Sequence, residues 1–139
     1  MRKTEQRLWD RMRGHLSPRG FFMERVENAV GEGTPDVTVL YAGIVTPTEL
    51  KAVEEPPTRI TTRLLPSGKG LSVTQLNWHL AWAKAGGRSL ILVGCGSRLI
   101  FGVDGIHADE VNDWSLENFA RGALAATWDE VAWHYGARP

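Results

Sequence analysis

The sequence predicts an α/β (α+β) protein in which one mixed central β-sheet is flanked by helices on both faces. Three observations support this prediction. A segment near the N-terminus has the apolar periodicity of an amphipathic helix, two runs rich in β-branched residues are joined by an Ala-Gly turn, and a capped helical segment precedes a buried apolar run. The expected order of elements is helix, three strands, helix, two strands and helix.

The first helix is expected to begin after Thr4, which can cap it, and to end at about Leu16. Residues 17–20, Ser-Pro-Arg-Gly, stop it, and residues 21–30 are expected to form a first strand that leads into a turn at residues 31–33. Four apolar residues define the buried face of this helix: Leu8, Trp9, Met12 and Leu16.

A β-hairpin is predicted next. Residues 37–41 form its first strand, Ala42 and Gly43 turn the chain, and the second strand runs from Ile44 to Lys51. Because strand residues alternate between the two faces of a sheet, Glu49 and Lys51 share a face and Leu50 lies on the other.

The second half of the chain opens with a loop at residues 54–70, which has little apolar periodicity. Ser72 or Thr74 then caps a helix that ends near Ala85, where a Gly-Gly pair stops it. The remaining expected elements are a buried strand at residues 89–94, a turn at 94–96, a strand at 97–103 and a Ser115-capped helix at 115–126.

The 139 residues predict a single domain, with a core at about residues 3–103 and a C-terminal helical extension at about 104–139. Apolar residues make up 42% of the chain and charged residues 23%, which favours a folded protein over a disordered one. The single cysteine, Cys95, excludes an internal disulfide and a Cys-rich zinc site, and a buried thiol is expected. No signal peptide or membrane-spanning run is evident, so we expect a cytoplasmic protein without membrane association.

The residues with the clearest chemical meaning are Asp36, Glu49 and Lys51. Asp36 opens the first hairpin strand and can therefore lie beside Glu49 on the second. Two adjacent carboxylates repel each other unless a cation neutralises them, and hard oxygen ligands suit Mg²⁺, with Mn²⁺ as a substitute. Such a metal activates a bound water, and the Lys51 ammonium can position that water and stabilise transition-state charge. The alternative interpretation is a surface hairpin with an ordinary Glu/Lys pair.

The sequence also resembles a known family. Pro35-Asp36 and, after twelve intervening residues, Glu49-Leu50-Lys51 resemble the PD-(D/E)xK nuclease signature. With Gly33 and the run at residues 71–78, they resemble the GxPD, ELK and LSxxQ pattern of the VRR-NUC and phage Holliday junction resolvase-like branch. The resemblance covers roughly residues 5–93.

This resemblance implies a restriction-endonuclease-like nuclease core with a metal held by Asp36, Glu49 and the backbone carbonyl of Leu50. It places Gln75 near the catalytic Lys51. A glutamate on the first helix joins the metal site in related resolvases, and Glu5 is the candidate here. The other interpretation of Glu5 is a partner of the helix dipole, and Asp10 and Glu27 are weaker candidates for the same role.

Contacts to DNA are expected from basic residues, because a chain with a formal net charge of zero must attract phosphates locally. We expect Arg59, Arg63 and Lys69 in the loop at 54–70 to contact phosphates. His79 lies one turn after Gln75 and is a further candidate, although a lone histidine on a helix is more often a satisfied structural side chain. Six basic residues gather near the N-terminus: Arg2, Lys3, Arg7, Arg11, Arg13 and Arg19.

The six tryptophans divide into two groups. Core packing explains Trp9, Trp78 and Trp82, which lie in amphipathic helices. We expect the other three to form a dimer interface, with a DNA-stacking platform as the alternative: Trp114, Trp128 and Trp133.

The expected function is that of a divalent-metal-dependent DNA endonuclease. Phosphodiester hydrolysis follows from the residues, whereas a preference for branched DNA, as in a Holliday junction resolvase, is implied only by the resemblance. Symmetric cutting of a junction implies a homodimer. The alternatives are a flap-cutting or restriction-type nuclease, a catalytically inactive nucleic-acid-binding module and a purely structural protein. The small size fits a phage or prophage recombination gene.

Overall fold

The computed structural model describes residues 3–26 and 33–137. Its centre is a five-stranded mixed sheet with the strand order β1-β2-β3-β4-β5. Strands β3 and β4 are parallel, and the other neighbouring pairs are antiparallel. The five strands are β1 (Phe22–Arg25), β2 (Val37–Tyr41), β3 (Ile44–Val53), β4 (Leu90–Cys95) and β5 (Leu99–Asp104). The predicted mixed sheet flanked by helices is confirmed.

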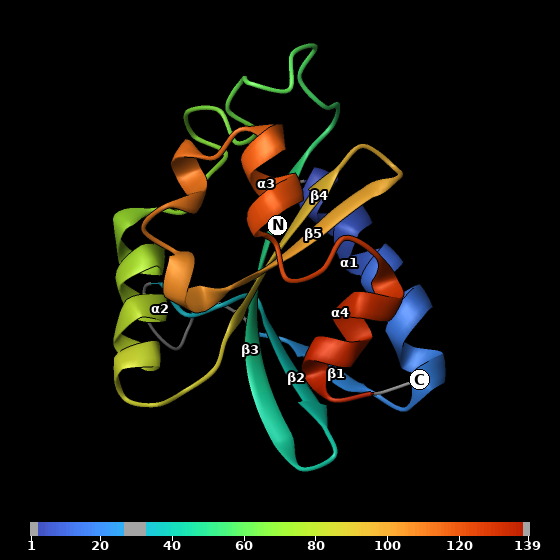
Figure 1. Ribbon diagram of the computed structural model, residues 1–139. Helices are drawn as coiled ribbons and strands as arrows, with labels where there is room; N and C mark the ends of the chain where they lie inside the picture. The colour runs from blue at the N-terminus through green and yellow to red at the C-terminus, as the bar shows by residue number, and fades with distance from the viewer. Residues whose placement is uncertain (1–2, 27–32, 138–139) are drawn as a thin grey trace.

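Helices cover both faces of this sheet (Figure 1). Helix α1 (Lys3–Leu16) and helix α4 (Trp128–Tyr135) contact each other on one face, and α1 packs on β3. On the opposite face lie α2 (Val73–Lys84) and α3 (Leu116–Gly122), and α2 packs on a 3₁₀ turn, η3 (Gly105–His107). Each face therefore has its own hydrophobic cluster.

The N-terminal helix and the hairpin form as expected. All four predicted core residues of α1 are buried: Leu8, Trp9, Met12 and Leu16. The hairpin turns at Ala42 and Gly43, both with positive φ, which is the geometry of the tight turns that join antiparallel strands. Helix α2 begins after Ser72, and the loop at residues 54–70 contains neither a helix nor a named strand.

Several boundaries were predicted wrongly. The first strand ends at Arg25 rather than near residue 30, and residues 27–30 of the predicted strand lie outside the described residues. Cys95 is the last residue of β4 and is buried, so it does not belong to a turn. The last strand, predicted at residues 97–103, is β5 and begins two residues later. Leu64 and Leu65 in the loop at 54–70 are buried in the core, although the loop lacks the apolar periodicity from which core residues are predicted.

The largest difference concerns the tail, where one helix was predicted at residues 115–126 and two are present. Helix α3 ends at Gly122, because the backbone of Ala125 pairs with Gly102 of β5 and interrupts the helix. Thr127 then caps α4, which the prediction missed. The apolar residues of α4 join α1 in one cluster, and the Tyr135 hydroxyl lies 2.6 Å from Oγ1 of Thr48 on β3.

The tryptophans also differ from expectation. Trp128 is 9% exposed, lies in the cluster shared with α1 and stacks on His15 with 5.0 Å between ring centroids, so it cannot form a dimer interface. Trp78 and Trp82 are only partly buried and stack on each other at 5.0 Å, outside the two core clusters. Trp9 is buried as predicted.

The burial of Trp128 leads to a stability prediction. Trp128→Ala should lower the free energy of unfolding by about 3 kcal/mol or more, because it removes a large side chain from a closed core. Trp133→Ala, on the same helix but only partly buried, is the matched control and should cost clearly less. Urea denaturation of both variants tests this, and equal losses for the two would contradict the assignment of Trp128 to the core.

Candidate active site

The structure brings Asp36, Glu49 and Lys51 to one place. Glu49 and Lys51 lie on the same face of β3, while the Leu50 side chain is buried in the cluster on the opposite face. Glu49 is fully buried and Lys51 is 8% exposed. A carboxyl group and an amino group are therefore held in the interior of the sheet, where unpaired charge is costly.

Asp36 joins the site from the residue before β2. Its Oδ2 accepts a hydrogen bond from the backbone N–H of Leu50 at 2.9 Å. This bond ties the Asp36 carboxylate across to β3 beside Glu49, and the two carboxyl groups lie within hydrogen-bonding reach of each other. The predicted pairing of Asp36 with Glu49 is thus present in the structure.

Gly33 explains why the first motif begins with a glycine. Its φ is +82°, a left-handed conformation that glycine adopts without strain. A Cβ at this position would also overlap the backbone carbonyl of Thr74 in the first turn of α2. The absence of a side chain lets the segment before Asp36 approach α2, which carries the other polar residues of the site.

Gln75 is held between the helix cap and Glu49. Its Oε1 accepts from the backbone N–H of Ser72 at 2.9 Å, and the Ser72 hydroxyl accepts from the Gln75 N–H, a reciprocal capping box. The cap fixes the orientation of the amide, so Nε2 donates to Oε2 of Glu49 at 3.4 Å. The sequence placed Gln75 near the lysine, and the structure shows that its polar contact is with the glutamate.

His79 occupies a different place from the one expected. Its side chain is fully buried, with Nε2 3.3 Å from Oε1 of Glu49 and Nδ1 2.7 Å from the Ser89 hydroxyl. A fully buried imidazole cannot touch a DNA phosphate, so the expected DNA contact by His79 is wrong. Sequence reasoning missed Ser89, since a serine at the start of a strand gives no recognisable signal.

The buried carboxyl group has a strongly altered proton affinity. Burial raises the pKa of Glu49 to about 10, and the hydrogen bond and negative charge of Asp36 act in the same direction. The charge of Glu5 also raises this pKa, whereas the Lys51 ammonium lowers it. Burial lowers the pKa of His79 to about 4, against the opposing charge of Asp36. The ionised form of Glu49 is therefore unfavourable in this environment unless a proton or a metal ion neutralises its charge.

The donor set of this site fits a hard divalent cation with retained waters. Two carboxylates and the Leu50 carbonyl would supply the protein ligands, and Mg²⁺ is commonly bound through one or two carboxylates plus water and phosphate. Within residues 3–26 and 33–137, no group of three or more Asp, Glu, His or Cys side chains is gathered as a metal cage. Such a cage suits structural metals more than Mg²⁺, so its absence from the described part is compatible with this donor set.

The three candidates on or near the first helix differ in position. Glu5 lies in the first turn of α1 and is within electrostatic reach of Glu49, while its role as a ligand stays a prediction. Asp10 is exposed and pairs with Arg13 at 2.6 Å, away from the carboxylates. Glu27 lies outside the described residues.

A hollow of about 530 Å³ opens beside the catalytic candidates. Lys51 and Gln75 lie on one side of it, and Arg63 and the 66–70 part of the loop lie on the other. Asn112 anchors this loop segment, because its side chain forms two hydrogen bonds with the backbone of Leu71, at 2.8 and 2.9 Å. Arg63 thus faces the site, whereas the predicted contacts Arg59 and Lys69 lie on exposed parts of the loop outside the hollow.

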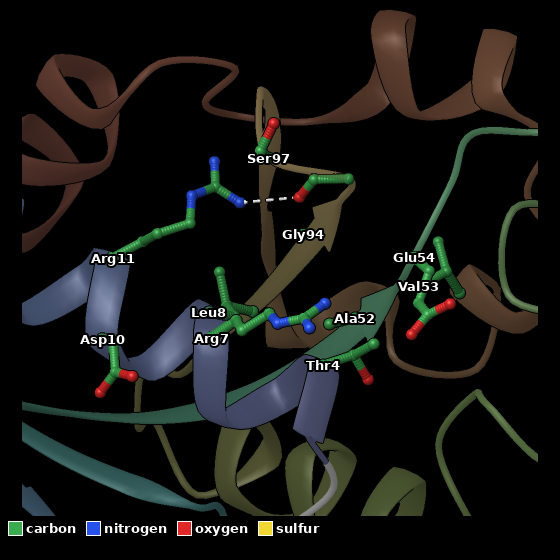
Figure 2. Close-up of a pocket in the computed structure, with 11 residues that line it drawn as sticks. Thr4, Arg7, Leu8, Asp10, Arg11, Ala52, Val53, Glu54, Gly94 and Ser97 are labelled. Atoms are coloured by element: carbon green, nitrogen blue, oxygen red, sulfur yellow. Dashed lines mark hydrogen bonds between the residues drawn. The ribbon is translucent and has the colours of Figure 1, made fainter.

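A second hollow, of about 510 Å³, lies on the other side of β3, between α1 and the ends of β3 and β4. Figure 2 shows Arg7 and Arg11 extending from α1 into it. Arg11 donates to the Gly96 carbonyl at 3.2 Å and lies over the Trp128 ring. Neither arginine forms a salt bridge with a described residue.

Comparison with known proteins supports the fold. Fifteen chains of solved structures match this one. Among them is Hjc of Archaeoglobus fulgidus, a Holliday junction resolvase from an archaeal hyperthermophile, with a TM-score of 0.51 and 17% sequence identity over 72% of this chain and 76% of that one. A scan against protein-family models and a search of curated proteins gave no match. The chain therefore has the α+β fold of this resolvase.

The altered pKa of Glu49 makes a prediction for the metal-free protein. Since the folded chain binds this proton up to a pH of about 10 and the unfolded chain only up to about 4.5, stability should fall as the pH rises between these values. Glu49→Gln removes the ionisable group. It should therefore raise the melting temperature relative to the wild type at high pH more than at low pH.

The measurement is thermal unfolding in chelator across that pH range, with Glu54→Gln, an exposed residue on the next segment, as the control. Parallel pH profiles for the wild type and Glu49→Gln would show that Glu49 ionises as freely in the folded protein as in water.

Proposed function

We propose that this protein is a divalent-metal-dependent endodeoxyribonuclease that hydrolyses phosphodiester bonds in branched DNA. One observation carries the proposal. A fully buried glutamate lies beside an aspartate, with a nearly buried lysine on the same strand face, and the lysine lines a hollow that Arg63 and the loop at 54–70 border. A structural role would not require a second carboxyl group beside a fully buried one.

The roles of the residues follow from their positions. Asp36, Glu49 and the Leu50 carbonyl would hold Mg²⁺, or Mn²⁺ in its place. When bound, the metal supplies a Lewis acid for the phosphate and lowers the pKa of a coordinated water. Lys51 faces the hollow, where its ammonium can hold the attacking water by a hydrogen bond and offset charge on the phosphate. Gln75 steadies Glu49 and borders the substrate space.

The choice of substrate rests on two supports. The similarity in fold to the Holliday junction resolvase Hjc supports DNA, and branched DNA in particular. The placement of basic residues supports two approaches for phosphates, since Arg63 borders the hollow beside Lys51 while Arg7 and Arg11 line the hollow across β3. A branched substrate presents more than one strand, and these two hollows could receive different strands.

Symmetric cutting of a junction needs two active sites, so a homodimer belongs to the proposal. Of the tail tryptophans, only Trp114 and Trp133 retain exposed surface that could contribute to its interface. The competing function is a flap-cutting or restriction-type nuclease with the same site. A catalytically inactive DNA-binding module is disfavoured, because all three of the candidate catalytic side chains are present and adjacent.

The first functional prediction concerns the site itself. Asp36→Asn, Glu49→Gln and Lys51→Met should each reduce cleavage by about 1,000-fold or more, because loss of the metal or the ammonium removes several kcal/mol of transition-state stabilisation. The assay uses a four-way junction, a flap, a duplex and a single strand, each with Mg²⁺, Mn²⁺ or chelator. Asp109→Asn, at an exposed position that lines neither hollow, is the control. A folded variant with near wild-type turnover would remove that residue from the site, and preference for the flap would favour the competing function.

The second functional prediction concerns the DNA path. Arg63→Gln should weaken junction binding and lower the slope of log Kd against log salt by about one unit, because one phosphate contact is lost. The exposed Arg59→Gln is the matched control on the same loop and should change the slope less. The double variant Arg7→Gln and Arg11→Gln tests the second hollow in the same titration. Equal slopes for Arg63→Gln and the wild type would place the DNA away from the hollow beside Lys51.

A further inference from the structure

The interior behind the metal site contains a chain of polar side chains that runs from Glu49 through His79 to Ser89. His79 contacts Glu49 Oε1 through Nε2 at 3.3 Å and the Ser89 hydroxyl through Nδ1 at 2.7 Å. Glu49 and His79 are fully buried, and Ser89 is 2% exposed. His79 and Ser89 are shielded from solvent, so any role they have at the site is exerted through Glu49.

The hydrogen-bonding capacity of these groups fixes the direction of each bond. When Glu49 is ionised as a metal ligand it can only accept, so His79 must present Nε2–H to it. Nδ1 is then unprotonated and must accept, and the Ser89 hydroxyl is the donor that reaches it. Ser89 thereby selects the imidazole tautomer that donates to the glutamate, as a carboxylate or carbonyl does behind a metal-bound histidine.

The surroundings of this chain leave it little freedom to rearrange. Gly105, the first residue of η3, packs against both side chains, and a Cβ there would overlap the Ser89 hydroxyl and lie 3.0 Å from Nδ1 of His79. Its N–H also donates to the Ser89 carbonyl at 3.0 Å. The turn after β5 therefore closes the space around the imidazole and holds it in contact with Glu49.

We propose that His79 is a positioning residue that orients the Glu49 carboxylate toward the metal, with Ser89 fixing its tautomer. Gln75 contacts Oε2 of Glu49 and His79 contacts Oε1, so α2 restrains both oxygens and fixes the plane of the carboxylate. Each oxygen keeps a further lone pair, and the Asp36 carboxyl, the other expected ligand, lies within hydrogen-bonding reach of the same group. This inference rests on the proposed metal site and assigns a function to a histidine that cannot reach DNA.

Two substitutions at His79 separate positioning from packing. In His79→Gln the side-chain amide can place a donor where Nε2 lies, and in His79→Asn it replaces only Nδ1, so the contact with Glu49 is lost. Mn²⁺ binding measured by electron paramagnetic resonance should weaken about 10- to 100-fold in His79→Asn, the usual effect of losing such an outer contact, and much less in His79→Gln. Ser89→Ala should weaken it in the same direction. Equal Mn²⁺ affinity in His79→Asn and the wild type would overturn the proposal.

A measurement on the unaltered protein avoids any doubt about folding of the variants. Nitrogen NMR of the Mg²⁺-loaded wild type at neutral pH should show His79 protonated at Nε2 and unprotonated at Nδ1, because the ionised Glu49 can only accept there, and Ser89→Ala should diminish this preference. The opposite tautomer would overturn the inference alone, whereas a wild type that binds no Mn²⁺ at all would overturn the proposed metal site together with it.

Discussion

The fold depends at its centre on the burial of one ionisable side chain, Glu49, in the middle strand of the sheet. Removing a carboxylate from water is among the more costly events in folding, and it is tolerated only with specific partners. Here the partners come from three elements: Asp36 from the segment before β2, Lys51 from β3 itself, and Gln75 and His79 from α2. The tight packing of Gly33 on α2, the cap at Ser72 and the closure by Gly105 all serve to bring these partners together.

This arrangement links the fold to chemistry. A buried carboxyl group with a raised pKa stays protonated at neutral pH. A divalent cation between Asp36 and Glu49 would displace this proton on binding. Without a cation, an ionised Glu49 beside Asp36 is unfavourable in the interior. A bound divalent cation would relieve this repulsion, and the relief would contribute to the affinity for the metal. The same positions leave Lys51 at the border of a hollow of about 530 Å³. In the proposed function, the sheet holds the catalytic side chains in place, and the basic residues of the loop at 54–70 attract the DNA phosphates.

The sequence predicted the parts of the molecule that local patterns control. The buried face of α1 and the Ala-Gly hairpin depend on residues close together in the chain, and both were correct; of the two caps that the sequence offered for α2, Ser72 and Thr74, the structure uses Ser72. The alternation of Glu49, Leu50 and Lys51 follows from strand geometry, and the structure confirms it. The pairing of Asp36 with Glu49 was also foreseen, because a hairpin places those two positions side by side.

The errors arose where distant contacts decide. The backbone pairing of Ala125 with Gly102 interrupts the predicted C-terminal helix. The residues around Ala125 contain no local pattern that predicts this pairing. His79 was a candidate for DNA contact because it lies one helical turn after Gln75, yet Glu49 on β3 and Ser89, the residue before β4, contact its imidazole in the interior.

The most direct test of the central claim is X-ray diffraction from crystals grown with Mn²⁺, using the anomalous signal of the metal to locate it. The account predicts a peak between Asp36 and Glu49, at about 2.1–2.2 Å from an oxygen of each, as expected for a hard octahedral cation. A well-ordered site between the two carboxyl groups without an anomalous peak, or a peak bound only elsewhere on the protein, would contradict it.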